Sequence, residues 1–247
     1  MEKNELITRR AAIVTGLASI SALLLPGCSK PLPPTYENIL RMGDAVTYAA
    51  HRALLSGQAL AKEYEYRDIS SFPATGTTNP GDSKIKSFSE AYSRLNKDTF
   101  SDWRLSIEGS VANPGVYSLA DLQKFPSRQQ ITKHQCEEGW SAIAEWTGVP
   151  LSSILKAAGI KSSARIVNCY AYDEYMESID LIDAFHPQTI LAYGMNGRNL
   201  AIAHGAPVRL RVETQIGYKS VKYLQRIVVT DEFVKTGDNG WAWYVGI

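Results

Sequence analysis

Short apolar segments fill the second half of this chain and restrict the folds open to it. They are four to ten residues long, as β-strands are, and they fall at about residues 103–107, 164–172, 189–195, 208–212 and 221–230. The helical patterns between them, at 119–124 and 151–158, are too few to alternate regularly with the strands. A parallel sheet built from βαβ units is therefore excluded, and the pattern predicts an α+β fold with mixed β-sheets and short helices.

Local end signals support these elements. Ser118 can cap the helix at 119–124, with Asp121 three residues later for a capping box. Pro150 suits the first turn of the helix at 151–158, and Gly159 suits its end. The dipeptide at 196–197, Asn-Gly, predicts a hairpin after the strand at 189–195.

The first hundred residues have a different pattern. Apolar positions recur at three- and four-residue steps between about residues 37 and 64, which predicts an N-terminal amphipathic helix. A proline-rich tether at 29–34 precedes it, and a polar loop rich in Gly, Pro and Thr follows at 70–83. We expect three regions: a signal segment at 1–28, the tether and helix at 29–66, and one domain at 67–247.

The extreme N-terminus is typical of an export signal. The pair Arg9–Arg10 precedes an apolar stretch that runs to Leu25, as in twin-arginine signals, and the stretch is too short for a confident membrane span. The sequence Leu-Pro-Gly-Cys that ends at Cys28 resembles a bacterial lipobox, although proline is unusual there. We expect a periplasmic protein that contacts the membrane only through its N-terminus, as a lipoprotein if Cys28 is lipidated. The alternative is that Cys28 is incidental.

Charge and cysteine content exclude other classes. The formal net charge of the 247 residues is +1, which gives no electrostatic reason to expect nucleic acid as a partner. The three cysteines, Cys28, Cys136 and Cys169, do not form a disulfide framework. A single Cys136–Cys169 disulfide stays open as an alternative.

Cys136 is the residue that most strongly suggests chemistry. It lies in the sequence His-Gln-Cys-Glu-Glu-Gly-Trp at 134–140, and no CxxC, HxxxH or HExxH spacing accompanies it, which argues against structural zinc. The thiol is therefore packed in the core, or a nucleophile with His134 or His204 as base, or one ligand of a metal whose other ligands come from a cofactor.

A group of cations follows about seventy residues later. His204, Arg209, Lys219 and Lys222 fall within nineteen residues on a strand–turn–strand pattern. Gly205 and nearby small residues allow backbone amides to approach a ligand, and arginine and lysine both bind phosphate. The group is either an anion-binding site or the solvated basic face of a hairpin.

Together these motifs resemble the molybdopterin-binding domain of the sulfite oxidase family, over about residues 103–231. The stretches at 136–141 and 146–151 are similar to those of bacterial periplasmic methionine-sulfoxide reductases. The His-Gly-Ala-Pro-Val-Arg stretch at 204–209 and the Ser-Val-Lys stretch at 220–222 are more similar to the sulfite-oxidising branch.

The resemblance implies a sulfite-oxidase-type molybdopterin-binding fold, with molybdenum-molybdopterin as cofactor and Cys136 as both metal ligand and catalytic residue. It also implies a set of residues that bind the pterin and its phosphate: His204, Arg209, Lys219, Ser220, Val221, Lys222, Asp173, Thr75 and Gly76.

The implied activity is oxygen-atom transfer on a small substrate, with electrons exchanged with a membrane cytochrome b or a periplasmic cytochrome c. Where sulfite oxidases place an arginine shortly after the cysteine, this chain has Glu137 and Glu138, and these carboxylates would repel the sulfite dianion. We therefore expect reduction of a sulfoxide or another S- or N-oxide. The alternatives are a sulfite dehydrogenase or oxidase, and a non-enzymatic periplasmic lipoprotein that acts as a binding module.

Overall fold

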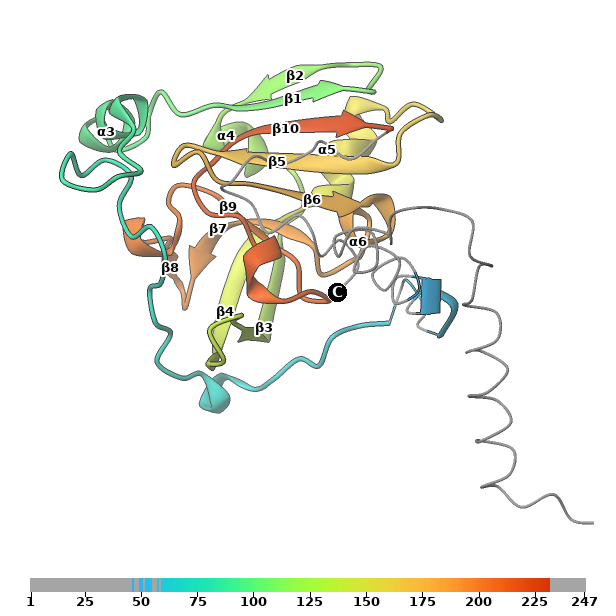
Figure 1. Cartoon of the computed structure of the whole chain (residues 1–247), viewed down its shortest axis with the longest axis horizontal. Coiled ribbons are helices and arrows are strands. Elements are labelled where there is room, and N and C mark those ends of the chain that lie inside the picture. The colour runs from blue at the N-terminus through green and yellow to red at the C-terminus, as the bar shows by residue number, and fades with distance from the viewer. Residues whose placement is uncertain (1–45, 47–48, 51, 55–56, 58, 232–247) are drawn as a thin grey trace, which may run out of the picture. The chain divides into compact units, whose positions relative to one another are not determined.

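Two β-sheets pack against each other and enclose the main core (Figure 1). The computed structural model describes residues 46, 49–50, 52–54, 57 and 59–231. Its strands are β1 (Leu105–Gly109), β2 (Gly115–Tyr117), β3 (Arg128–Gln135), β4 (Ser141–Pro150), β5 (Ile166–Ala171), β6 (Met176–Asp180), β7 (Ile190–Met195), β8 (Arg198–Asn199), β9 (Arg209–Arg211) and β10 (Leu224–Thr230). Its helices and 3-10 turns are η1 (Tyr66–Asp68), α3 (Glu90–Lys97), α4 (Leu119–Leu122), α5 (Leu151–Ala158), α6 (Leu181–Ala184), η2 (Ile202–His204) and η3 (Gly217–Lys219).

The first sheet has the order β2-β1-β10-β5-β6, and the second has the order β3-β4-β7-β8 with β9 also paired to β7. Only β1 and β10 pair in parallel; the other described pairs are antiparallel. In Figure 1, β3 and β4 run across the direction of β1, β10 and β5. This arrangement confirms the expected α+β class with mixed sheets.

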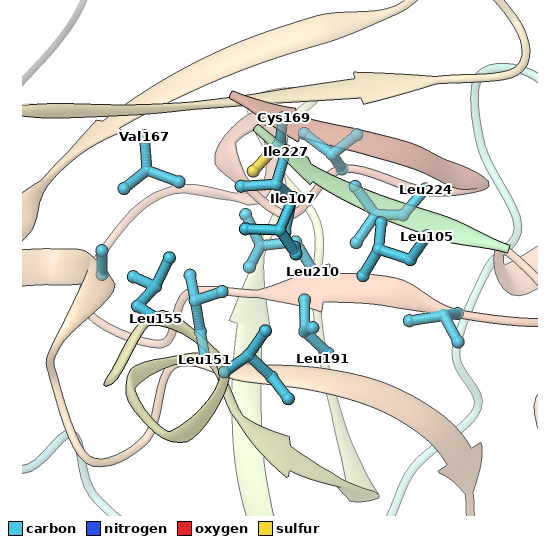
Figure 2. Close-up of a cluster of buried hydrophobic side chains, with 14 of the residues drawn as sticks. Leu105, Ile107, Leu151, Leu155, Val167, Cys169, Leu191, Leu210, Leu224 and Ile227 are labelled. Carbon is cyan, nitrogen blue, oxygen red and sulfur yellow. The ribbon is translucent and has the colours of Figure 1, made fainter. Parts of the chain in front are cut away.

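The core lies between the two sheets. Figure 2 shows side chains of β1, β5 and β10, among them Ile107, Cys169 and Ile227, facing side chains of the second sheet and of α5, among them Leu191 and Leu155. All five side chains are 0% exposed. Buried and less buried residues alternate along β1, and a slip of one residue there would turn Ile107 toward solvent.

A second, smaller cluster of buried side chains is built around Trp146 of β4. Its other members are Ala144, Ile190, Ala192, Met195 and Leu200, and Phe72 packs against it from outside the sheet. The Trp146 ring also faces two cations, since the guanidinium carbons of Arg209 and Arg211 lie 5.2 and 4.4 Å from its centre. Phe72 and Arg209, which contact this cluster, also line the cavity described below.

Most of the expected elements are confirmed. Helix α4 has Ser118 as its N-cap and a capping box with Asp121, and α5 ends at Gly159 in the left-handed region, with φ 69°. The hairpin between β7 and β8 turns at Asn196 and Gly197, both with positive φ. Two expectations were too long: β9 covers only three residues, and β10 begins at Leu224 because η3 and an irregular segment precede it.

The expected N-terminal helix is shorter than its sequence pattern suggested. Residues 46, 49–50 and 52–54 are helical, and the earlier part of the pattern lies outside the described residues. From residue 59 the chain is extended, and Glu63 forms an isolated β-bridge with Thr132, so the expectation of helix up to residue 64 is wrong. The tether, the signal segment and Cys28 lie outside the described residues. Within the described part of the chain, no helix has both the length and the apolarity to span a membrane.

A long segment without strands of its own, residues 59–77, runs along the outer edge of β3 and then contacts β4; we call it the strap. The side chain of Gln188 binds both the N–H and the C=O of Ala61, at 2.8 and 3.0 Å. Further along, the Tyr64 N–H donates to the carbonyl of Ile131, and the Ser70 N–H donates to that of Ile143. The strap therefore covers the edge of the second sheet with backbone hydrogen bonds and continues toward the cavity.

The β-bulge in β4 requires glycine at position 148, which gives a first prediction. A Cβ there would lie 2.3 Å from the carbonyl oxygen of Leu191. We expect Gly148→Ala to lower the free energy of unfolding by about 1–3 kcal/mol, because backbone must shift to admit the methyl group. Gly115→Ala is the matched control, since a Cβ there meets only ordinary contacts from 3.4 Å outward. Equal urea midpoints for the two variants would contradict the prediction.

Candidate functional site

A cavity of about 430 Å³ opens where the tip of the β3–β4 hairpin, the strap and the loops around β9 and β10 meet. Residues from all of these segments line it, although they are far apart in sequence. The lining consists of Phe72, Pro73, Ala74, Thr75, Gly76, Thr77, His134, Cys136, Glu137, Glu138, Trp140, Asp173, Tyr175, Ala203, His204, Arg209, Gly217, Tyr218, Ser220, Val221 and Lys222.

Cys136 lies in the tight turn that joins β3 to β4. Its backbone N–H donates to the carbonyl of Trp140 at 2.9 Å, and its carbonyl accepts from the N–H of Gly139 at 3.0 Å. Gly139 has a φ of 90°, a left-handed conformation that glycine adopts without strain. The turn therefore holds the cysteine at the cavity wall, where its side chain is 8% exposed.

The thiol of Cys136 is not activated by its protein neighbours. Burial raises its pKa, and the charges of Glu137 and Glu138 raise it further. The Sγ atom donates to the Glu137 carboxylate at 3.6 Å, and within the described chain neither His134 nor His204 forms a hydrogen bond with it. A cysteine–histidine nucleophile is therefore not assembled.

A disulfide is also excluded for this cysteine. Cys136 and Cys169 are both free thiols, and Cys169 is 0% exposed in the core between the sheets. The alternative of a Cys136–Cys169 disulfide is wrong.

Two carboxylates stand next to the thiol at the cavity wall. Glu138 accepts a hydrogen bond from the indole N–H of Trp140 at 3.0 Å, and Glu137 contacts the Cys136 sulfur. Among the described residues neither glutamate forms an ion pair with lysine or arginine. This end of the cavity is therefore negatively charged.

Arg209 brings a buried positive charge to the cavity. It is 4% exposed, and its two terminal nitrogens donate to the carbonyls of His204 and Ser220 at 3.0 and 2.9 Å. Burial lowers its pKa to about 9, with a further contribution from Arg211. Its Nε is buried without a hydrogen-bond partner, and no carboxylate in the described chain pairs with it. Arg209 is therefore a buried cation without a counter-ion in the described chain.

Lys222 supplies a second cation and ties the strap to the cavity. Its ammonium donates to the carbonyl of Thr75 at 2.8 Å and to that of Thr77, and the hydroxyl of Tyr223 donates to the Thr77 carbonyl at 2.9 Å. Burial lowers the pKa of Lys222 to about 8, and the charge of Arg209 acts in the same direction. Asp173 partly opposes this effect, and burial raises its own pKa.

Most of the residues expected to bind the pterin line this one cavity. They are Thr75, Gly76, Asp173, His204, Arg209, Ser220, Val221 and Lys222. Burial lowers the pKa of His204, which keeps its imidazole neutral beside Arg209 and Lys222. Within the cation group Arg209 and Lys219 are buried and His204 and Lys222 are half-buried, which disagrees with the alternative of a solvated basic face.

Lys219 departs from the expectation. It lies in the 3-10 turn η3, but its side chain extends to β6, where the ammonium binds the Glu177 carboxylate at 2.9 Å and the Ser178 carbonyl at 3.0 Å. Both side chains of the pair are at most 1% exposed. Lys219 therefore stabilises the wall behind the cavity and is not among the residues that line it.

Several lining residues were not predicted, chiefly Phe72, Tyr175, Tyr218 and, as a cavity residue, His134. The Phe72 ring lies 5.1–5.6 Å from the rings of His134, Trp140, Trp146 and His204. In the structure Gln130, Thr132 and His134 form a polar buried face of β3, and this face leads to Cys136 just beyond the strand.

The residues present fit a molybdopterin cofactor. A group of three or more His, Cys, Asp and Glu side chains that could hold a metal does not occur in the described part of the chain, so a metal at Cys136 needs ligands from elsewhere. Arg209 is buried and Lys222 is half-buried, and neither forms an ion pair with a carboxylate in the described chain, so both can bind a phosphate. Cys136 would bind the metal, and a bound metal would deprotonate its thiol despite the raised pKa.

Comparison with known proteins agrees with this site. Residues 92–237, more than half of the chain, match the family described as oxidoreductase molybdopterin binding domain. A protein of Azospira oryzae named as a protein-methionine-sulfoxide reductase subunit, YedZ1, is 31% identical over 98% of this chain and 89% of its own length. The catalytic subunit MsrP of protein-methionine-sulfoxide reductase from Campylobacter jejuni is 28% identical over 83% of this chain and 76% of its own.

A solved structure also resembles the fold. The sulfane dehydrogenase SoxCD from Paracoccus pantotrophus superimposes with a TM-score of 0.51 at 27% identity, over 53% of this chain and 39% of that chain. The match, the site and these relatives lead to one conclusion. The chain belongs to the oxidoreductase molybdopterin-binding domain family and is a molybdenum-molybdopterin-dependent oxidoreductase.

Proposed function

We propose that this protein reduces neutral S- or N-oxides, with methionine sulfoxide as the first candidate. One observation carries the proposal: Glu137 and Glu138 line the cavity beside Cys136, and neither forms an ion pair within the described chain. A dianion such as sulfite would be repelled by these two charges at the cavity wall, whereas a neutral oxide would not. The names of the YedZ1 and MsrP relatives support the same substrate class.

The reaction is a two-electron reduction: a sulfoxide, two electrons and two protons give a thioether and water. When bound, the cofactor supplies the two-electron redox chemistry. The chain supplies Cys136 as metal ligand and Arg209 and Lys222 as partners of the phosphate. Phe72 and Trp140 give the cavity wall apolar surface that suits the carbon substituents of the oxide.

A protein partner has to deliver the electrons in this proposal, and a cytochrome is the class we favour. The chain resembles an enzyme domain that binds molybdopterin, and the two relatives compared above are both named as subunits. Either a membrane cytochrome b or a periplasmic cytochrome c would meet the need.

We also propose export to the periplasm. The support comes from the sequence at Arg9–Arg10, the apolar stretch to Leu25 and Cys28. Transport of a folded protein suits an enzyme that takes up its cofactor first, and lipidation of Cys28 would attach it to the membrane surface.

The first prediction here concerns Lys222 and cofactor loading. The phosphate of the cofactor binds the charged form of the Lys222 ammonium. The contribution of Lys222 to cofactor affinity is therefore fully present below its pKa of about 8 and falls as the pH rises above that value. In Lys222→Arg the fall should move to higher pH, because the guanidinium keeps its proton, and Lys222→Ala should weaken loading at all pH values by about 2–5 kcal/mol.

The measurement is the molybdenum and pterin content of cofactor-free protein after incubation with the cofactor across this pH range. Lys62→Ala, at an exposed position on the strap that does not line the cavity, is the control. Full loading of Lys222→Ala would show that this lysine does not hold the phosphate.

The second prediction tests the substrate class. With a dye as electron donor or acceptor, we expect kcat/KM for a methionine sulfoxide to exceed that for sulfite. The double variant Glu137→Gln, Glu138→Gln should raise the sulfite value on the order of tenfold, because two repelling charges are removed. Glu90→Gln on α3, an exposed position outside the cavity, is the matched control, and Cys136→Ala should be inactive toward both. Sulfite oxidation faster than any oxide reduction in the native protein would refute the proposal.

The third prediction concerns export. Arg9→Lys with Arg10→Lys should leave the protein in the cytoplasm, because the twin-arginine route reads both residues. Cys28→Ala should move the exported protein from the membrane to the soluble periplasmic fraction without changing its sulfoxide reduction. Unchanged membrane association of Cys28→Ala would rule out lipidation at that residue.

A further inference from the structure

The imidazole of His134 is bound from behind by Arg211. His134 is the last inward-facing residue of β3, two residues before Cys136, and both line the cavity. Its Nδ1 lies 2.7 Å from a terminal nitrogen of Arg211 on β9. Cys136 lies in the turn just beyond the strand, and its side chain and the His134 ring both line this cavity.

This contact determines which nitrogen of His134 carries the proton. A guanidinium has only N–H donors and no acceptor, so Nδ1 must accept the hydrogen bond. Nδ1 therefore carries no proton, and the neutral ring carries its single proton on Nε2. The tautomer follows from the identity of the two partners at 2.7 Å.

Arg211 is itself held in place. Its Nε and second terminal nitrogen donate to the two oxygens of Glu213 at 3.1 and 2.7 Å, and both side chains are 1% exposed. Gln130 donates to the same carboxylate at 3.0 Å, and the guanidinium lies 4.4 Å above the Trp146 ring. The nitrogen that remains is the one directed at His134, so the imidazole has a rigid support.

The opposite nitrogen, Nε2, belongs to a ring that lines the cavity. It has no hydrogen-bond partner in the described chain and is not among the atoms sealed from solvent. Gly217, another lining residue, makes room for it, since a Cβ there would lie 2.6 Å from Nε2 and Cε1. The rings of Phe72 and Trp140 lie 5.1 and 5.4 Å from the imidazole.

We propose that His134 is the residue that recognises the oxide, donating its Nε2–H to the substrate oxygen while Phe72 and Trp140 contact the carbon substituents. Arg211 is the positioning residue that keeps the proton on Nε2. The inference rests on the proposed oxide reduction. A sulfoxide oxygen accepts hydrogen bonds and has no proton to donate, so an N–H donor matches it. Because the sulfoxide carries no net charge, a neutral donor is sufficient.

The first test reads the tautomer directly. Nitrogen-15 NMR of the loaded enzyme should show Nε2–H and an unprotonated Nδ1 for His134, and the variant His134→Asn assigns its signal among the four histidines. Dimethyl sulfoxide added without an electron donor should shift the Nε2–H proton. A proton on Nδ1, or an Nε2–H signal that does not respond to the sulfoxide, would overturn the inference.

The second test compares two isosteric variants. The amide oxygen of His134→Asn can still accept from Arg211, but its side chain ends short of Nε2, whereas His134→Gln places an amide nitrogen near the Nε2 position. We expect kcat/KM for the sulfoxide to fall on the order of 10- to 100-fold in His134→Asn, mainly through KM, and to recover in His134→Gln. Molybdenum and pterin contents equal to those of the native protein exclude a loss of cofactor as the cause.

The outcomes separate the two proposals. Sulfoxide turnover that is unchanged in His134→Asn would sink the inference about His134 and leave the proposed function standing. A native enzyme that turns over no oxide, yet shows the Nε2–H tautomer, would instead sink the proposed function and the substrate contact that depends on it.

Discussion

The stacking of two arginines on one tryptophan ring is the interaction on which the site depends. Arg209 and Arg211 are two residues apart on β9, so their side chains leave the strand on one face, and both guanidiniums lie against Trp146. Their electrostatic situations differ. Glu213 neutralises Arg211, which becomes a rigid structural support, whereas the hydrogen bonds of Arg209 within the described chain go to backbone carbonyls. A buried charge without a counter-ion destabilises the fold. Binding of an anion would remove this cost, and the free energy recovered would add to the affinity of the site.

The cavity is electrically polarised as a result. Glu137 and Glu138 stand at the Cys136 end, and Arg209 and Lys222 stand among the loops of η2 and β10. A bound molecule with a phosphate at one end and a metal at the other has one favourable orientation in such a field. If oxide reduction takes place beside Cys136, as proposed, the same field favours a neutral substrate over an anionic one at that end.

A large part of the fold and of this site could be predicted from the sequence, because short local motifs determine many of their elements. The capping box at Ser118 and the glycine after α5 depend only on neighbouring residues, and both are confirmed. The short motifs around Cys136 and Arg209 pointed to the cysteine and the cations that the cavity brings together.

What could not be predicted depends on long-range packing. Nothing local to Lys219 shows that Glu177, more than forty residues earlier, would be its partner. The role of Phe72 depends on the strap reaching four aromatic rings from other elements. The apolar period at residues 59–64 resembled a helix, but the edge of β3 offers those residues hydrogen bonds in an extended form.

The strap has a mechanical consequence. Its contacts through Ala61, Tyr64 and Ser70 come before the cavity loop in the chain, and the clamp on Thr75 comes after them. Tension that enters from the N-terminal side must break those earlier hydrogen bonds before it can displace the loop. The cavity is thereby insulated from pulling on the preceding segment, so that a chain held by its N-terminal end would keep its reactive centre undistorted.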